Sequence, residues 1–316
     1  MGTYSRRFAT SAIALCLTLA GALWSVGDAT AAPRTPLHVP YNFLVDAIPG
    51  SFADTPPGTN NWRCKPPKAH PEPVILVHGF AASRGNNWQT YGPLLFNHGY
   101  CVFAVNYGGL GFTGGYAAME LSARELGAFV QQVLRATGAK KVTLIGHSEG
   151  ATMPLGYLKF EHGNKYVSKM IGLAGVAHGW GGVDGVRFPQ IGGGNEPAMF
   201  GFMPTSAFIQ RLNRGGITQP GTQYTQIVTR YDDVVLPWTS GIIREPGAVN
   251  IIIQDPCAND LSDHLSIVSD PNVAHFVLKT LDPSYDLPLR CTPVYPVFGV
   301  MPGTPIPPGI SAPLPS

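Results

Sequence analysis

The chain has 316 residues, of which 44% are hydrophobic and only 13% are charged, and its formal net charge is +2. A near-neutral chain without a basic, aromatic-interleaved run does not favour a nucleic-acid-binding protein. The length allows one large α/β domain or two small ones, and 38 Gly with 30 Pro are typical of a loop-rich exported protein.

The first 31 residues have the pattern of a secretory signal peptide. Two arginines precede an apolar stretch over residues 8–26, and Ala29-Thr30-Ala31 offers small residues before a cleavage site at Ala32. The alternative is an uncleaved membrane anchor, because the apolar run is nearly long enough to span a bilayer. We expect cleavage, and therefore a secreted, extracellular protein without a stable transmembrane segment.

Four cysteines remain after removal of the signal peptide, an even number that fits an oxidising compartment. Three pairings are possible, and free buried thiols are the alternative to all of them. We predict Cys64–Cys101 and Cys257–Cys291, because each pair joins neighbours in sequence and flanks a predicted core strand. No cysteine or histidine group has metal-ligand spacing, so we expect neither a metal site nor a cofactor.

Short apolar runs separated by helical patterns predict an α/β fold with a mostly parallel central sheet and helices on both faces. The expected strands cover residues 73–77, 100–105, 141–145, 169–173, 223–229 and 249–253, and the clearest expected helices cover 117–137 and about 272–281. Gly138 is expected to stop the first of these helices.

The domain is expected to cover residues 32–291 and to begin with an extended lead-in over 32–72. Its Gly-rich segment 178–221 carries many apolar side chains and is a possible cap or lid over an acyl pocket, with ordinary core packing as the alternative. The apolar side chains of that segment include Phe188, Met199, Phe200, Phe202, Met203 and Phe208. The Pro-rich tail 292–316 is expected to be an extended strap or disordered.

Gly146-His147-Ser148-Glu149-Gly150 follows a predicted strand directly and opens a helical segment. In this context G-x-S-x-G indicates a nucleophile on a tight strand-to-helix turn, where small residues let neighbouring backbone approach. The motif alone occurs by chance, and an ordinary glycine-rich loop is the alternative. The flanking strand and helix favour Ser148 as a catalytic nucleophile.

A serine hydroxyl needs a base, and the base needs a carboxylate to orient it, in the chain order serine, acid, histidine. Asp232 lies just past the strand 223–229, with Asp233 as the second candidate for the acid. His264 lies in the loop after the last strand and is the expected base. His275 falls within a helical pattern, where a surface role is expected, and His178 precedes the acid.

The oxyanion formed during attack needs two backbone N–H donors. Glu149, immediately after the nucleophile, is expected to supply one of them. His78-Gly79-Phe80 follows the first strand and places Phe80 where the second donor is expected, although a His-Gly pair can also form a simple turn.

The sequence resembles the secreted class 2 lipases of actinobacteria and, more remotely, the fungal lipase B type. The resemblance runs from about Asn61 to Cys291 and is carried by PVILVHGF at 73–80, CVFAVNYG at 101–108, GHSEG at 146–150, TRYDDVVLP at 229–237 and SDHLSI at 262–267. It implies an α/β-hydrolase fold, Asp232 as the acid, His264 as the base, and the same two disulfides. The Pro-rich tail and the segment 178–221 depart from the family pattern.

These observations predict a secreted serine carboxylic-ester hydrolase, a lipase that cleaves acylglycerols at an interface and acts as a monomer. Rival functions with the same three residues are a short-chain esterase, a polyester or cutin depolymerase, and a secreted acyltransferase. A non-catalytic binding module on this fold is the rival from a different class. Nucleic acid is not an expected partner.

Overall fold

The computed structural model describes residues 1–2, 35–109, 112–180 and 197–313. Thr35–Ser316 form one compact unit that holds every strand and helix described below. Residues 3–31 of the expected signal peptide and its cleavage site lie outside the described residues. Among the residues that are described, no helix combines the length and apolar character needed to cross a membrane.

The central sheet is parallel throughout its described strands, in the order β2-β1-β3-β4-β5-β6. The strands are β1 (Val74–Val77), β2 (Val102–Val105), β3 (Val142–His147), β4 (Val167–Leu173), β5 (Gln223–Val228) and β6 (Ala248–Ile252). Each lies within two residues of its expected position at either end. The predicted fold class is confirmed.

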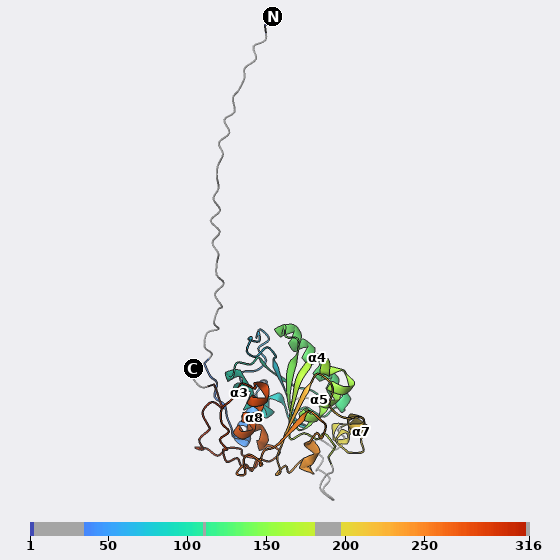
Figure 1. Cartoon of the computed structure of the whole chain (residues 1–316), viewed down its shortest axis with the longest axis vertical. Coiled ribbons are helices and arrows are strands. Elements are labelled where there is room, and N and C mark those ends of the chain that lie inside the picture. The colour runs from blue at the N-terminus through green and yellow to red at the C-terminus, as the bar shows by residue number, and fades with distance from the viewer. Residues whose placement is uncertain (3–34, 110–111, 181–196, 314–316) are drawn as a thin grey trace. The chain divides into compact units, whose positions relative to one another are not determined.

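Helices cover both faces of this sheet. They are α1 (Phe43–Gly50), α2 (Arg84–Asn87), α3 (Tyr91–Asn97), α4 (Met119–Thr137), α5 (Glu149–Phe160), α6 (Pro197–Gly201), α7 (Ala207–Asn213) and α8 (Pro271–Leu281). In Figure 1, α3 and α8 lie on one side of the strands, and α4, α5 and α7 lie on the other.

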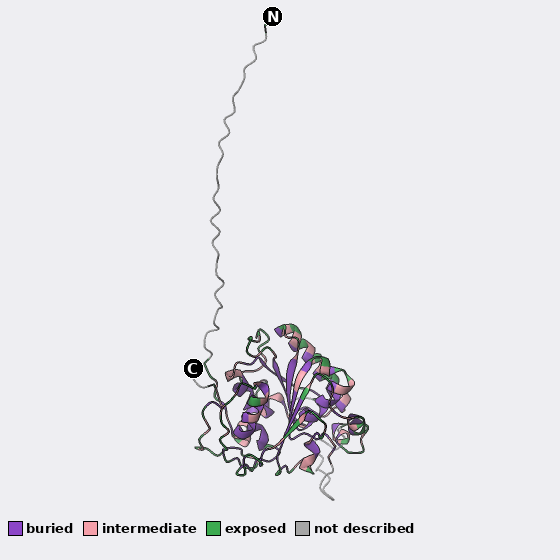
Figure 2. Cartoon of the chain, viewed as in Figure 1, coloured by how far each residue is buried: buried purple, intermediate pink, exposed green. Residues whose placement is uncertain are grey.

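Two hydrophobic cores result, because alternate residues of each strand point to opposite faces. Val77 and Phe103 pack on the side of α4 and α5, whereas Leu76 and Ala104 pack on the side of α3 and α8. Both sets are fully buried, and Figure 2 shows the central strands as largely buried, whereas β6 at the end of the strand order has exposed residues. Burial on both faces explains why β1 (VILV) and β2 (VFAV) are continuous apolar runs rather than alternating ones.

Local signals explain where α4 ends and where α8 begins. Gly138 ends α4 in the left-handed region at φ 78°, as expected from its lack of a side chain. At the start of α8, the Asp270 side chain accepts hydrogen bonds from two backbone N–H groups, and Pro271 takes the first helical position.

The lead-in differs from the expectation, because it includes the helix α1 between extended stretches. Asn42 caps this helix by accepting a hydrogen bond from the Val45 N–H at 3.1 Å. Eight residues are too few to give a periodic signal in the sequence, and packing of α1 against α2 stabilises a helix that would be marginal alone.

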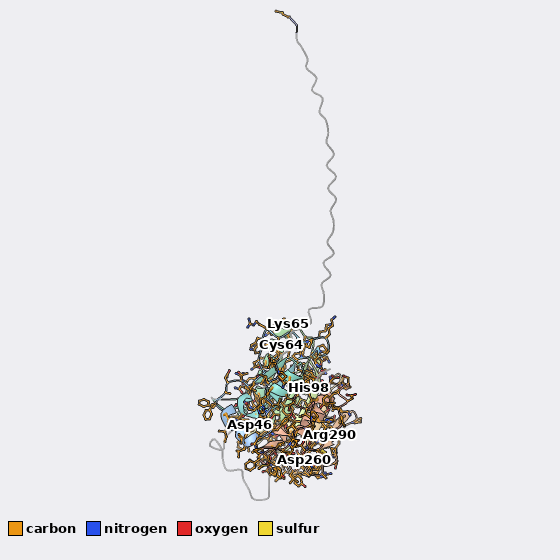
Figure 3. The ribbon with its side chains drawn as sticks, turned by 90° about the vertical axis from the view of Figure 1, so that its left-hand side faces the viewer. Asp46, Cys64, Lys65, His98, Asp260 and Arg290 are labelled. Atoms are coloured by element: carbon orange, nitrogen blue, oxygen red, sulfur yellow. A yellow bond between two sulfur atoms is a disulfide. The ribbon has the colours of Figure 1, made fainter. Side chains whose placement is uncertain are left out.

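Both predicted disulfides are present, Cys64–Cys101 and Cys257–Cys291. The first, whose Cys64 is labelled in Figure 3, ties the lead-in to the start of β2. The second ties the residues after β6 to the segment after α8. The tail takes the form of a strap, with Val294, Val300 and Ile310 buried in the same core as α3 and α8.

Candidate active site

Ser148 lies on the tight turn between β3 and α5, with φ 55° and ψ −115°. A positive φ is unfavourable for a residue with a side chain and persists only where the surroundings enforce it. The neighbouring glycines allow the turn: a Cβ on Gly146 would lie 1.7 Å from the Gly150 carbonyl oxygen, and one on Gly150 would lie 2.0 Å from the Val77 oxygen. The G-x-S-x-G pattern therefore meets a steric requirement here.

Asp232 and His264 are brought together by the loops that follow β5 and β6. His264 Nδ1 lies 3.0 Å from Asp232 Oδ2, and both side chains are buried. The other oxygen, Oδ1, accepts from the backbone N–H groups of Val234 and Val235 at 3.0 and 2.6 Å. Because a carboxylate oxygen accepts, this contact places a hydrogen on Nδ1 and leaves Nε2 for another partner.

The other candidates for acid and base lie elsewhere. Asp233 is exposed, whereas Asp232 is 5% exposed and contacts the histidine. His275 is buried in α8 against the rings of Phe276 and Tyr285, so the expected surface role is wrong. His178 contacts Asn213 Oδ1 and the Ile242 carbonyl oxygen, which indicates a role in holding its loop.

The two expected N–H donors flank the serine turn. Glu149 is the first residue of α5, and Phe80 follows β1 in a loop that touches the turn, since a Cβ on Gly79 would lie 3.2 Å from Ser148 Cβ. No acceptor in the described part of the chain takes a hydrogen bond from either backbone N–H. Both groups are therefore free to bind an oxygen of a substrate.

The Glu149 side chain is a feature that the motif did not reveal. It is fully buried, and neither carboxyl oxygen has a hydrogen-bond partner among the described residues. Burial raises the pKa of this carboxyl well above its usual range, which keeps it neutral. Its Oε2 would lie 2.7 Å from a Cβ on Gly115, so a glycine there makes room for the acid.

His147, the second residue of the motif, links the parts of this site. Its Nε2 lies 2.9 Å from the carbonyl oxygen of His264, and its Nδ1 lies 3.0 Å from Asn87 Oδ1. The same Asn87 oxygen accepts from the Gly79 N–H at 3.1 Å. Burial lowers the pKa of His147 to about 3, so the imidazole is neutral and can donate only one of its two contacts.

The described part of the Gly-rich segment packs beside the loop after β1 that carries Phe80. Phe202 is buried with its ring centroid 6.3 Å from that of Phe80, and Phe208 is buried in the core beneath α5. Phe200 and Met203, in contrast, are exposed. Phe188 lies outside the described residues, and the cap or lid stays a prediction.

Residues 72–199 match the family described as the alpha/beta hydrolase fold. Two curated relatives, triacylglycerol lipases of Pseudarthrobacter phenanthrenivorans and Burkholderia plantarii, are each 42% identical over 83 residues. That stretch covers 25% of this chain and 25% and 22% of theirs, so the match spans about a quarter of each relative.

Solved structures agree on the fold. Lipase B of Aspergillus fumigatus superposes with a TM-score of 0.55 at 19% identity, over 68% of this chain and 52% of that one. The mature lipase BlEst2 of Bacillus licheniformis gives a TM-score of 0.50 at 18% identity, over 69% and 94% of the two chains. The chain has the α/β-hydrolase fold, and its expected resemblance to lipases, including a fungal lipase B, is confirmed.

Proposed function

We propose that this chain, an α/β-hydrolase by fold, is a serine carboxylic-ester hydrolase that uses Ser148, Asp232 and His264. The observation that carries the proposal is the buried hydrogen bond from His264 to Asp232, formed beside a strained turn that bears a serine. Because His147 binds the backbone of His264, the base is held against the residue that precedes the nucleophile. Serine, base and orienting acid are the three parts that acyl transfer to a hydroxyl requires.

The reaction follows from these groups in two halves. His264 Nε2 removes the Ser148 proton as the serine oxygen attacks the ester carbonyl carbon, and Asp232 stabilises the imidazolium that forms. The N–H groups of Phe80 and Glu149, at the positive end of α5, bind the oxyanion. His264 then protonates the leaving alcohol, and a water molecule attacks the acyl-enzyme by the same route.

Acylglycerols are the substrate class that we favour, because exposed apolar side chains lie in the segments that follow β2, β4, β5 and β6, as the catalytic candidates follow their own strands. These exposed side chains are Phe112, Phe200 in α6, Met203, Tyr231 and Leu265. Large exposed apolar side chains are costly in water, and a group of them is a feature of proteins that meet a lipid surface. The two curated relatives are named as triacylglycerol lipases, which agrees with this class.

Secretion belongs to the same proposal. The two disulfides are consistent with an oxidising, extracellular compartment, and the expected signal peptide would deliver the chain there. A lipase that meets its substrate outside the cell needs no cofactor from the cytoplasm, and the proposed chemistry uses none.

The testing experiment is hydrolysis of p-nitrophenyl esters from short to long acyl chains. The Ser148→Ala variant is expected to lose about 10⁴–10⁶-fold in turnover, whereas Ser284→Ala, at an exposed serine remote from the turn, retains the wild-type rate. A wild-type rate in Ser148→Ala would overturn the proposal. Preference for long chains supports a lipase, and preference for short chains supports an esterase or polyester depolymerase.

Two further readouts separate the remaining rivals. Labelling of Ser148 by a fluorophosphonate probe is expected, and its absence would favour a non-catalytic binding module. An acceptor alcohol added to the assay distinguishes an acyltransferase, which would pass the acyl group to that alcohol in preference to water.

A further inference from the structure

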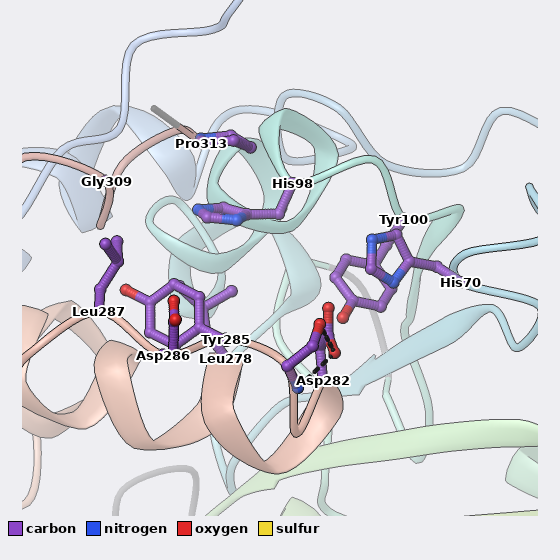
Figure 4. A pocket seen from close by; sticks show the side chains of 11 residues that line it. His70, His98, Tyr100, Leu278, Asp282, Tyr285, Asp286, Leu287, Gly309 and Pro313 are labelled. Carbon is purple, nitrogen blue, oxygen red and sulfur yellow. Dashed lines mark hydrogen bonds between the residues drawn. The ribbon is translucent and has the colours of Figure 1, made fainter. Parts of the chain in front are cut away.

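A cavity of about 310 Å³ lies at the opposite edge of the sheet from the serine turn. His70 precedes β1, Tyr100 precedes β2, and Asp282 ends α8, so the cavity forms where these strands begin rather than where they end. Gly309 and Pro313 of the tail form another wall (Figure 4). None of its lining residues belongs to the proposed catalytic machinery.

The fixed charge around this cavity is negative. Asp282 and Asp286 line it, and of the described lining residues none is Lys or Arg. Two hydrogen bonds from Ser284 to Asp282 Oδ1, from the backbone N–H at 2.9 Å and the hydroxyl at 2.7 Å, lower the pKa of that carboxyl. The carboxylate is therefore ionised at neutral pH and keeps Oδ2 for another donor; Lys169 adds a weaker cationic influence from outside the lining.

The two histidines of the cavity do not balance that charge. Burial lowers the pKa of both His70 and His98, so both are neutral at pH 7. His98, labelled in Figure 3, has Nε2 2.9 Å from the Ile310 carbonyl oxygen. Since a carbonyl only accepts, the proton sits on Nε2 and Nδ1 is left as an acceptor.

Aromatic rings and an orphan hydroxyl complete the site. The His70 and Tyr100 rings lie with centroids 4.1 Å apart and planes tilted by 30°, and His98 meets Tyr285 edge-on at 6.1 Å. Tyr100 is 5% exposed, yet its hydroxyl has no hydrogen-bond partner within the described chain, and it points toward Asp282 in Figure 4. A buried hydroxyl without a partner carries a free-energy penalty that a ligand could remove.

We propose that this cavity binds a small organic cation, an alkylguanidinium or alkylammonium. Two carboxylates and a histidine lone pair accept its N–H groups, the aromatic rings attract its charge, and the Leu278 and Leu287 side chains contact its alkyl stem. An anion would face two carboxylates, and a neutral ligand would leave their charge unbalanced. A metal ion is disfavoured because no group of three or more His, Cys, Asp or Glu in the described chain is arranged to hold one.

Isothermal titration calorimetry of the whole mature protein with n-butylguanidinium, n-butylammonium and the neutral n-butylurea tests this proposal. We expect the two cations to bind with Kd on the order of 0.1–1 mM, and the urea at least about tenfold more weakly. Equal binding of the cations and the urea, or no heat from any probe at about 10 mM, would overturn the proposal.

Variants assign the binding to this cavity. Asp282→Asn and the exposed Asp286→Asn are each expected to weaken cation binding, the first by about tenfold. Asp233→Asn, an exposed carboxylate at the other edge of the sheet, is the matched control and is expected to leave binding unchanged. The double variant Asp282→Asn/Asp286→Asn removes both carboxylates. If Asp286→Asn folds normally and the double variant binds the cations as wild type does, the cavity is not the site.

The titration is independent of ester hydrolysis, because Ser148→Ala is expected to bind the cations with wild-type affinity. Failure of the cation proposal would therefore leave the proposed function standing, and failure of the hydrolysis assay would leave this site standing.

Discussion

The two edges of the sheet treat their polar groups in different ways. At the carboxyl ends of the strands, His264 contacts both Asp232 and His147 in a buried network beside a strained serine. The Glu149 carboxyl there, without a partner in the described chain, is fully buried rather than facing a cavity. At the amino edge, Tyr100 and Asp282 face a cavity, and the tyrosine hydroxyl has no partner among the described residues. A preorganised network suits chemistry, whereas unpaired polar groups around a cavity suit binding.

The largest effect on the comparison between the two edges is a loss of kcat, expected when Asp232 is replaced. Asp232→Asn is expected to lower kcat by about 10⁴-fold, because an amide no longer holds the proton on His264 Nδ1 or stabilises its cation. Asp233→Asn, one residue away and exposed, is expected to stay within about twofold. Steady-state hydrolysis of a p-nitrophenyl ester measures both, and equal losses in the two variants would contradict the assignment.

The next effect concerns stability at the buried acid Glu149. Its pKa is raised in the folded protein and has its ordinary value in the unfolded chain, so only the unfolded chain releases the proton as pH rises above about 4.5. Folding stability is therefore lost with rising pH, by about 1.4 kcal/mol per pH unit, until the folded pKa is reached.

The Glu149→Gln variant lacks this titration and is expected to gain stability over wild type as the pH rises from 5 to 8. Urea denaturation of both proteins at three pH values measures the difference between their free energies of unfolding. If that difference were the same at every pH, Glu149 would be ionised in the folded protein.

A smaller effect is expected from His147→Ala. Loss of the contact to the His264 carbonyl displaces the base, and a misplacement of about 1 Å costs about 10²-fold in kcat with little change in KM. His147→Gln, whose amide can donate to the same carbonyl, is expected to restore part of the rate. A rise in KM with unchanged kcat would instead indicate a role in binding.

The smallest effect is expected at the other edge. Tyr100→Phe removes a buried hydroxyl without a partner in the described structure. The free energy of unfolding, measured by urea denaturation, is therefore expected to stay level or rise by up to about 1 kcal/mol. Ester hydrolysis is expected to remain within about twofold. A loss of more than about 1 kcal/mol would show that the hydroxyl has a protein partner, and would weaken the contrast between the two edges.

Local signals were sufficient for most of the fold and for the proposed catalytic residues. Strands such as β1 and β2, buried on both faces, are continuous apolar runs, and the tight serine turn needs glycine two residues to either side. The sequence therefore determined the strands, the long helices α4 and α8, and Ser148. The chain order that follows from this fold pointed to His264 and narrowed the acid to two neighbouring aspartates.

Tertiary structure alone decided the rest, because these properties depend on residues far apart in sequence. Burial and a hydrogen bond across the β5 and β6 loops distinguish Asp232 from Asp233. Asn87, brought by α2, gives His147 its linking position. The amino-edge cavity joins the lead-in, the end of α8 and the tail, whose contacts leave no periodic pattern in the chain.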